Sequence, residues 1–175
     1  MKQKLYTSIG LMSGTSMDGV DISIIQSDGQ YQFHNILDEY FEYDVDLQDE
    51  LIRLRKLLSN QNNLLKNSKD LRNLERKITV FHAEKIKHIL LQYNYKIDLI
   101  GFHGQTIFHD PQQKITKQLG DGKLLSQLLK KKVVYDFRQK DIENEGQGAP
   151  LTPIFHHLLS KIINEKFKTG FPIGF

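Results

Sequence analysis

Cysteine is absent from this sequence of 175 residues, which excludes disulfide bonds and thiolate metal sites. The first seven residues lack the long apolar core of a secretory signal, and no stretch approaches the roughly 20 apolar residues of a membrane span. Neither sign of charge dominates, because 24 Lys and Arg against 21 Asp and Glu leave a net charge of +3, too small to indicate a nucleic-acid binder. The short run at Lys130, Lys131 and Lys132 is interpreted as a solvated helix end. We therefore expect a cytoplasmic protein without nucleic-acid or membrane partners.

The hydrophobic pattern predicts three strands at the start of the chain. An apolar run at residues 5–12 turns at residues 13–16, and an alternating, β-branched run follows at residues 20–25. Asp28 and Gly29 are typical of a hairpin turn, and residues 31–37 are interpreted as the third strand. The chain therefore opens as an antiparallel meander.

Helices and short strands are predicted to alternate after the meander. Leucines at positions 47, 51, 54 and 58 lie on one helical stripe, and apolar spacing predicts a long helix over residues 69–92, with a polar loop at residues 60–68 between them. Further elements are buried strands at 97–101 and 133–135 and helices at 123–129 and 151–167. This order predicts a mixed α/β sheet with helices on its faces, and the length suits one domain or one lobe of a two-lobed protein.

The first turn, rich in Gly, Ser and Thr, is the most informative segment. A tight turn between strands exposes backbone N–H groups, and the hydroxyls of Thr15 and Ser16 add further donors for phosphate oxygens. It is not the P-loop, because the pattern Gly-x-x-x-x-Gly-Lys is absent and a strand follows. On chemistry alone, an ordinary hairpin with common turn residues remains the alternative.

Residues 10–21, Gly-Leu-Met-Ser-Gly-Thr-Ser-Met-Asp-Gly-Val-Asp, resemble the first phosphate motif of the anhydro-N-acetylmuramic acid kinases, sugar kinases of the actin/hexokinase superfamily. The resemblance implies a ribonuclease H-like lobe that binds ATP with Mg²⁺. Met12 stands where the wider superfamily usually carries an Asp, so a Mg²⁺ contact would come from elsewhere, and Asp18 and Asp21 are the candidates. The ATP-binding residues that it implies are Gly14, Thr15, Ser16, Met17, Asp18, Gly19, Val20 and Asp21.

A second block, Phe-His-Gly-Gln-Thr at residues 102–106, is expected at the carboxyl end of a buried strand, where α/β proteins place ligand contacts. Its side chains suit a polyhydroxylated sugar, although a His after a strand is also a common packed residue. The block resembles the family's His-Gly-Gln-Thr motif. The resemblance implies that His103, Gln105 and Thr106 bind the anhydro sugar.

Three later blocks also resemble family segments. Residues 118–122 resemble the family's turn before a helix, or form a simple turn whose Asp121 caps that helix. Arg138 follows a strand, and its planar fork suits the lactyl carboxylate of the implied sugar; surface ion pairing with Asp136 or Asp141 is the alternative. Residues 146–151 form a glycine-rich entry to a helix that begins with a proline in its first turn. The implied sugar-binding residues are Arg138, Gln147 and Gly148.

A metal-dependent His-Asp hydrolase is a further alternative. His103, His109 and Asp110 are close in sequence, but this chemistry needs more ligands. His82 and His88 are available, yet their spacing indicates the surface of a helix.

The resemblance extends from about residue 9 to residue 151, and the helix after it is consistent in type. Family members continue with Asn-Ile-Gly-Gly and Asp-Thr-Gly-Pro-Gly segments, and the Asp of the latter is taken to activate the water that opens the anhydro ring. Neither segment is found here, so no catalytic residue is assigned and the base is expected beyond Phe175. Residues 1–175 are therefore expected to be the N-terminal lobe, inactive alone, of a truncated, split or decayed homologue, and a separately encoded C-terminal half is one candidate for its partner. A non-catalytic remnant or an interaction protein is the alternative.

Overall fold

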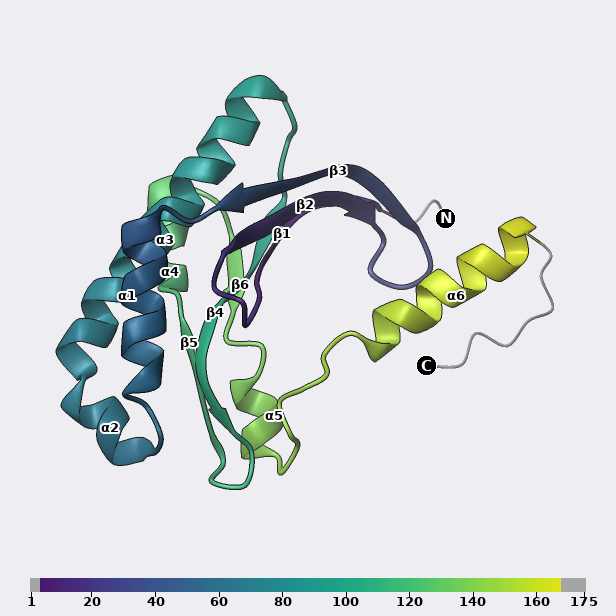
Figure 1. Cartoon of the computed structure of the whole chain (residues 1–175). Helices are drawn as coiled ribbons and strands as arrows, with labels where there is room; N and C mark the ends of the chain where they lie inside the picture. Colours follow the sequence, from purple (N-terminus) through teal and green to yellow (C-terminus); the bar gives the residue numbers. More distant parts are fainter. Residues whose placement is uncertain (1–3, 168–175) are drawn as a thin grey trace.

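A mixed sheet forms the frame of the computed structural model, which describes residues 4–167 (Figure 1). Within these residues the sheet has six strands. Five follow the order β3-β2-β1-β4-β5, and the sixth, β6, lies off this path and pairs with β4. The β1–β4 and β4–β6 pairs are parallel and the other pairs are antiparallel, so the predicted mixed α/β sheet is confirmed. The strands are β1 (Tyr6–Ser13), β2 (Gly19–Ser27), β3 (Phe33–Glu42), β4 (Leu99–Asp110), β5 (Ile115–Leu119) and β6 (Val133–Tyr135).

The predicted antiparallel meander is also confirmed. β1 pairs with β2 and β2 with β3, and Gly29 turns the second hairpin with a φ of 79°. Asp28 closes that turn, because its carboxylate accepts three backbone N–H groups, which lowers its pKa. β3 runs beyond the predicted residues 31–37, since it pairs with β2 along its whole length, from Phe33 to Glu42.

Helices α1, α3, α4 and α6 occur where the periodicity predicts them, whereas two short helices were not predicted. The polar segment interpreted as a loop contains α2, which begins after Asn60, whose side chain accepts the N–H of Asn63. α5 follows β6 and was also missed. Residues 168–175, which lie beyond the expected match to the family, are outside the described part. The helices are α1 (Val45–Lys56), α2 (Gln61–Lys66), α3 (Ser68–Gln92), α4 (Gly122–Leu129), α5 (Gln139–Glu143) and α6 (Pro153–Phe167).

One face of the sheet is covered by α1, α3 and α4 (Figure 1), and the apolar core lies beneath them. α3 crosses two clusters: its C-terminal half packs on β1, β2 and β4, and its N-terminal half packs against α1. The strands alternate buried and exposed side chains, as expected for a sheet covered on one face. A long helix thus connects both ends of the covered face.

The other face of the sheet is more open. An apolar groove of about 480 Å³ lies over Gly10, Ser23 and Ile25. Phe155 of α6 reaches this groove, and its ring contacts that of Phe33 edge-to-face with a centroid distance of 5.0 Å. α6 otherwise extends away from the sheet, and most of its described residues are exposed (Figure 1).

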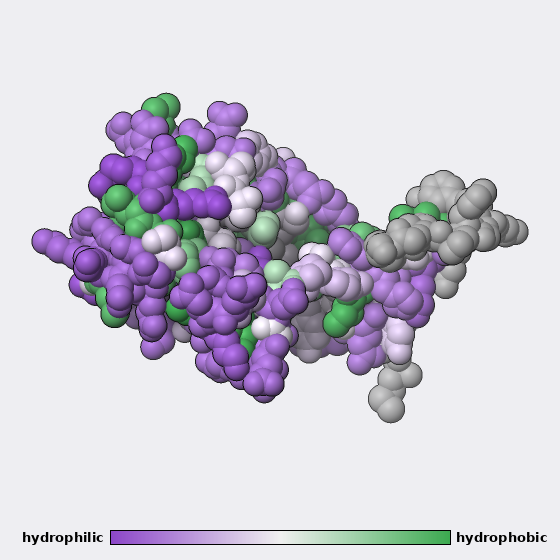
Figure 2. Space-filling view, turned by 60° about the horizontal axis from the view of Figure 1, so that its bottom comes forward, coloured by the Kyte–Doolittle hydropathy of each residue, from purple (hydrophilic) through white to green (hydrophobic). Residues whose placement is uncertain are grey.

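The outer surface seen in Figure 2 is mostly hydrophilic, with hydrophobic residues in small separate groups. Among the described helices, none combines the length and the apolar character needed to cross a membrane.

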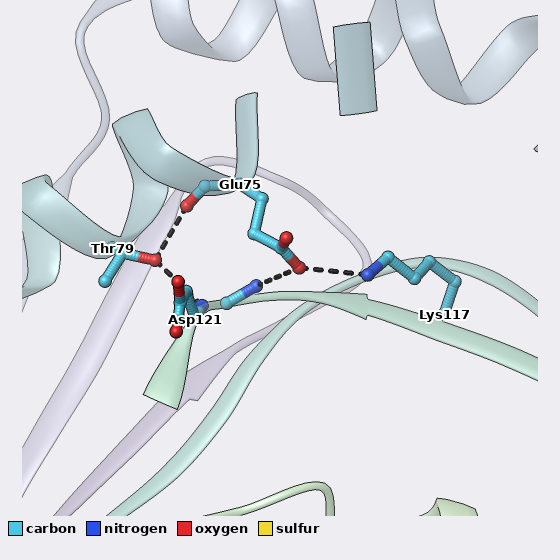
Figure 3. A network of polar contacts seen from close by, with 5 residues as sticks. Glu75, Thr79, Lys117 and Asp121 are labelled. Atoms are coloured by element: carbon cyan, nitrogen blue, oxygen red, sulfur yellow. Dashed lines mark hydrogen bonds and ion pairs between the residues drawn. The ribbon is translucent and has the colours of Figure 1, made fainter. Parts of the chain in front are cut away.

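A polar network ties α3 to the segment between β5 and α4 (Figure 3). The Glu75 carboxylate accepts from the Lys117 ammonium at 2.9 Å and from the Gly120 N–H at 3.3 Å. The Thr79 hydroxyl donates to the Glu75 carbonyl at 2.7 Å and accepts from the Asp121 N–H at 2.9 Å. Asp121 in turn accepts the Leu124 N–H and caps α4, as the simple-turn alternative predicts. The segment at residues 118–122 therefore has a structural role.

A second polar network is buried between α3 and β1. His82 is fully buried on the apolar stripe of α3, so its predicted place on the helix surface is wrong. Its Nδ1–H donates to the Ile78 carbonyl at 2.7 Å, so its Nε2 accepts from the Ser13 hydroxyl at 3.2 Å. The Ser13 oxygen in turn accepts from the Tyr43 hydroxyl at 2.8 Å. This proton order fixes a neutral imidazole beneath the end of β1.

A β-bulge interrupts the β1–β4 pairing and fixes two side-chain directions. Leu11 pairs with Phe102 and Ser13 with Gln105, so one residue of β1 opposes two of β4, with Gly104 at a φ of 72°. Gln105 therefore faces the helix-covered side, as Phe102 does, and His103 faces the open side. The His-Gly-Gln-Thr block thus lies inside β4, not after a strand as predicted, because β4 continues to Asp110 to pair with β5.

We predict that Gly104→Ala lowers the free energy of unfolding by about 3 kcal/mol, since a left-handed backbone and a clash add together. An added Cβ would lie 2.6 Å from the Leu119 carbonyl oxygen. Gly29→Ala is the matched control, because Gly29 has a φ of 79° but no atom within 4 Å of an added Cβ. Its cost should be about 1 kcal/mol. Urea denaturation measures both, and equal losses would show that the close approach at Gly104 contributes nothing.

We also predict that stability falls on acidification through His82. Burial lowers the pKa of His82 from 6.5 to about 4, so between these values the unfolded chain binds the proton and the native state does not. The free energy of unfolding should therefore drop by about 3 kcal/mol as the pH falls from about 6.5 to 4. Tyr43, whose pKa is raised to about 12 by burial, stays neutral throughout this window.

Denaturation of wild type and His82→Gln across pH 4 to 7 tests this expectation. In the variant, the free energy of unfolding should still fall with pH, but less steeply than in wild type. The remaining dependence is expected from His103, whose pKa is also lowered, by burial and by the charge of Arg138. Identical slopes in both proteins would contradict the assignment to His82.

Candidate functional site

The hairpin turn between β1 and β2, defined here as residues 14–18, is anchored by a buried methionine. Met17 is 1% exposed and packs with α1 and α3 in the second apolar cluster. Its backbone is left-handed, with a φ of 60°, and its N–H donates to the Gly14 carbonyl at 3.3 Å. The side chain of Met17, one of the residues predicted to bind ATP, therefore holds the turn on the core.

Two side chains from distant elements bind carbonyls of the hairpin turn. The Gln105 amide of β4 donates to the Gly14 carbonyl at 2.7 Å, and the Arg55 guanidinium of α1 donates to the Thr15 carbonyl at 3.1 Å. In the described part of the chain, the N–H groups of Thr15 and Ser16 have no protein acceptor. The exposed side of the turn thus presents unpaired donors, which is the chemistry that an anion requires.

The other predicted nucleotide residues divide between the core and the surface. The side chain of Val20 is fully buried in β2. Gly19 has no side chain, and an added Cβ would collide with the Phe41 carbonyl oxygen. Neither residue therefore offers a side chain to a nucleotide. Asp18 and Asp21 are exposed. The Ser16 hydroxyl donates to the Asp18 carboxylate at 2.6 Å, which lowers the pKa of Asp18.

The carboxylates of Asp18 and Asp21 are the candidate contacts for the expected Mg²⁺. Residues 4–167 contain no group of three or more His, Asp or Glu side chains that could hold a metal ion. Mg²⁺ is usually bound by one or two carboxylates together with substrate phosphates and water, so a site of this kind is compatible with Asp18 and Asp21.

A second group, the His103–Arg138 cluster, comprises His103, Arg138, Asp141 and Gly148. The Arg138 Nε–H donates to His103 Nε2 at 2.9 Å, and its Nη1 donates to the Gly148 carbonyl at 2.6 Å. Asp141 accepts the Gly148 N–H at 2.7 Å, so both polar ends of Gly148 are held. Three of the predicted sugar-binding residues thus come together from β4 and from the segments on either side of α5.

The hydrogen bonds of His103 fix its protonation. Its Nδ1–H donates to the Gly104 carbonyl at 2.7 Å, so Nε2 carries no proton and accepts from Arg138. Burial, and then the Arg138 charge, lower the pKa of His103 and keep the ring neutral. Both ring nitrogens are therefore engaged, and His109 bonds to Thr116 instead. This geometry does not support the metal-dependent hydrolase.

Arg138 does not make the surface ion pair that was the alternative for it. In the described residues the ion pairs join other side chains, and Asp141 bonds to a backbone N–H. Burial lowers the pKa of Arg138, but an arginine guanidinium is so strongly basic that it stays charged. Within the described part of the chain, the Arg138 guanidinium bonds to His103 and Gly148.

The remaining predicted sugar residues do not join the cluster. Gln105 is fully buried and directed to the hairpin turn, the Thr106 hydroxyl accepts from Gln118 at 3.4 Å, and Gln147 is exposed. Asp141 and Arg55 were missed as site residues. Asp141 was noted only as an ion-pair candidate, and nothing in the sequence around Arg55 indicates a contact 40 residues away.

The two groups of residues lie on neighbouring strands. Gln105, two residues after His103, is the register partner of Ser13, which precedes the hairpin turn. The turn and the cluster are therefore joined through the β1–β4 pair, at the end of β1 that enters the turn.

A family model described as anhydro-N-acetylmuramic acid kinase matches residues 6–169, most of the chain. Curated relatives with that name include a protein of Pelagibacter ubique, 58% identical over 157 residues, which covers 90% of this chain and 42% of the relative. A protein of Agrobacterium fabrum is 40% identical over 172 residues, or 95% of this chain and 45% of the relative.

A protein of Methylobacterium nodulans is 41% identical over 169 residues, or 88% of this chain and 45% of the relative. The chain thus spans less than half the length of these curated relatives. The match falls on the segments that form the hairpin turn and the His103–Arg138 cluster. The chain belongs to the anhydro-N-acetylmuramic acid kinase family.

Proposed function

We propose that this chain provides the phosphate- and sugar-binding lobe of an ATP-dependent, cytoplasmic kinase of 1,6-anhydro-N-acetylmuramic acid. The reaction would open the anhydro ring with water and give N-acetylmuramic acid 6-phosphate, a step in cell-wall sugar recycling. Family membership is the observation that carries this proposal. The hairpin turn and the His103–Arg138 cluster divide the task between them.

The hairpin turn is proposed to receive the β- and γ-phosphates of ATP. The unpaired N–H groups of Thr15 and Ser16 support this, since backbone donors in a turn bind anionic oxygen. Asp18 and Asp21 would contact Mg²⁺, which would neutralise phosphate charge when bound. The Ser16 hydroxyl, which now donates to Asp18, could turn to a phosphate oxygen once a cation holds that carboxylate.

The His103–Arg138 cluster is proposed to bind the sugar. The Arg138 fork is oriented by His103 and Gly148, so it loses little freedom when it binds a carboxylate. The lactyl group of the proposed sugar offers such a carboxylate. Because His103 is neutral, it orients the guanidinium without competing for the anion.

Turnover is proposed to need a C-terminal segment like the one that completes the length of the relatives, on the same or on a second polypeptide. The coverage of 42% to 45% of those relatives supports this. A general base contributes about 10²- to 10⁴-fold in rate, and none is assigned in this chain. A non-catalytic binding or interaction protein is the second candidate, favoured by the open apolar groove beside α6.

Turnover separates these two candidates. The chain is co-expressed with the C-terminal part of the Pelagibacter ubique relative, and ATP-dependent formation of N-acetylmuramic acid 6-phosphate is measured by mass spectrometry. Product from the pair and not from either part alone supports the kinase. Sugar binding by calorimetry without turnover in any combination would favour the non-catalytic candidate.

Arg138→Lys is predicted to remove discrimination for the lactyl carboxylate. Wild type should bind 1,6-anhydro-N-acetylmuramic acid at least about tenfold more tightly than 1,6-anhydro-N-acetylglucosamine, which lacks the lactyl group, since hydrogen bonds to charged groups contribute about 1.5–3 kcal/mol. Lysine keeps the charge but not the fork, so the variant should bind both sugars at similar strength.

Calorimetric titration of both proteins with both sugars measures the effect, and Arg53→Lys, an exposed arginine of α1, serves as control. Undiminished preference in Arg138→Lys would show that another group recognises the carboxylate.

A further inference from the structure

We propose that Gln105 and Arg55 are positioning residues of the hairpin turn, which hold two successive carbonyls so that the N–H groups of Thr15 and Ser16 are presented to phosphate. This inference rests on the proposed function of the turn as a phosphate site. It assigns a role to Arg55, which no sequence pattern indicated, and a different role to Gln105, which was predicted to bind sugar.

The planarity of the peptide bond couples the direction of each carbonyl to that of the next N–H. In a trans peptide, the carbonyl of one residue and the N–H of the next point in opposite directions. The Gly14 carbonyl is held toward the protein interior by Gln105 at 2.7 Å, so the Thr15 N–H points away from the interior. The Thr15 carbonyl is held toward α1 by Arg55 at 3.1 Å, so the Ser16 N–H points away from that helix.

Gln105 is well suited to fix the first peptide. It is fully buried, and the bulge at Gly104 directs it to the helix-covered side of the sheet. Its Nε2 donates to two carbonyls, those of Gly14 and Thr106, which determines the orientation of the amide. Its Oε1 is buried without a hydrogen-bond partner in the described part of the chain, so the fold tolerates an unpaired acceptor to keep this contact.

Arg55 fixes the second peptide from another element. It lies in the last turn of α1, a helix anchored by the buried Leu51 and Leu54. Its guanidinium reaches across to the turn, 40 residues earlier in the sequence. Its charge also lies next to the proposed phosphate site, so a test must separate charge from hydrogen bonding.

Without these contacts the two peptides could rotate and present carbonyl oxygens, which repel phosphate. The buried Met17 side chain holds the turn on the core, and the Met17 N–H also donates to the Gly14 carbonyl at 3.3 Å, but neither contact binds the Thr15 carbonyl. Gln105 therefore adds a shorter contact, at 2.7 Å, to a carbonyl that the turn also holds, and Arg55 holds the Thr15 carbonyl.

The test is a titration of the ¹⁵N-labelled chain with ADP and, separately, with tripolyphosphate, followed by NMR. In wild type the Thr15 and Ser16 amides should shift with both probes. Gln105→Met and Arg55→Met should each bind about fivefold more weakly, the loss expected for one hydrogen bond. Methionine keeps the length of either side chain and removes its donors.

Two controls isolate the effect. Arg53→Met removes one positive charge from the same turn of α1, and Gln26→Met removes a glutamine that donates to Thr7 at the far end of the sheet. Both controls should bind within about twofold of wild type. An equal loss in Arg53→Met and Arg55→Met would reduce the role of Arg55 to charge and overturn the inference for it.

The outcomes distinguish the inference from the function on which it rests. If wild type binds neither ADP nor tripolyphosphate, both the proposed phosphate site and the positioning role of Gln105 and Arg55 are overturned. Wild type and folded variants that bind equally, with the same amides shifted, would overturn the inference alone. Should Gln105→Met fail to fold, the exposed Arg55→Met variant decides the outcome by the same comparison with Arg53→Met.

Discussion

The parallel pairing of β1 with β4 is the constraint on which the rest of the site depends. It brings the hairpin turn next to a strand 91 residues away in sequence, and the side chain of Gln105 completes the contact by binding Gly14. The bulge at Gly104 then directs the side chains of His103 and Gln105 to opposite faces of the sheet. His103 faces the open side, where Arg138 meets it, and Gln105 faces the covered side beneath the turn. A regular strand would place both side chains on one face.

The covered side contains a polar network beneath the end of β1, where the hairpin turn begins. His82, Ser13 and Tyr43 form a chain of hydrogen bonds with one proton order, buried directly before the hairpin turn. Because buried polar groups are costly unless paired, such a chain favours one packing of β1 against α3 over alternatives. The end of β1 is thus fixed by directional contacts, which apolar packing alone would not provide.

The strands and long helices could be predicted from the sequence because period and turn chemistry are local properties. The Asp28-Gly29 turn, the leucine stripe of α1 and the apolar spacing of α3 each specify their element without reference to the rest of the chain. One error arose where another strand decides, because β4 continues past His103 to pair with β5. Another was local, since α2 forms in a polar segment that Asn60 caps.

The candidate site follows the same division. His103, Arg138 and Gly148 could be named from short motifs, but the orientation of Arg138 depends on contacts 35 and 10 residues away that no local pattern encodes. Met17 and Val20 belong to a motif segment yet face the core, because a motif does not separate residues that contact a ligand from those that shape the backbone. Gln105 could not be assigned to the turn, since that contact needs the register shift at the bulge.

The arrangement also limits what this lobe can contribute to a reaction. Oriented backbone donors and an oriented guanidinium act on charges that are present before and after phosphoryl transfer, so they chiefly favour binding. Rate acceleration needs groups that act more strongly on the transition state than on the bound substrates. In the proposed reaction the water must lose a proton as the ring opens, and the described ionisable groups of the cluster do not suit that step. His103 accepts from Arg138, Asp141 accepts from Gly148, and Arg138 stays protonated. Positioning of both substrates is therefore the role proposed for the described part of this chain, and that proposal assigns the base to another segment.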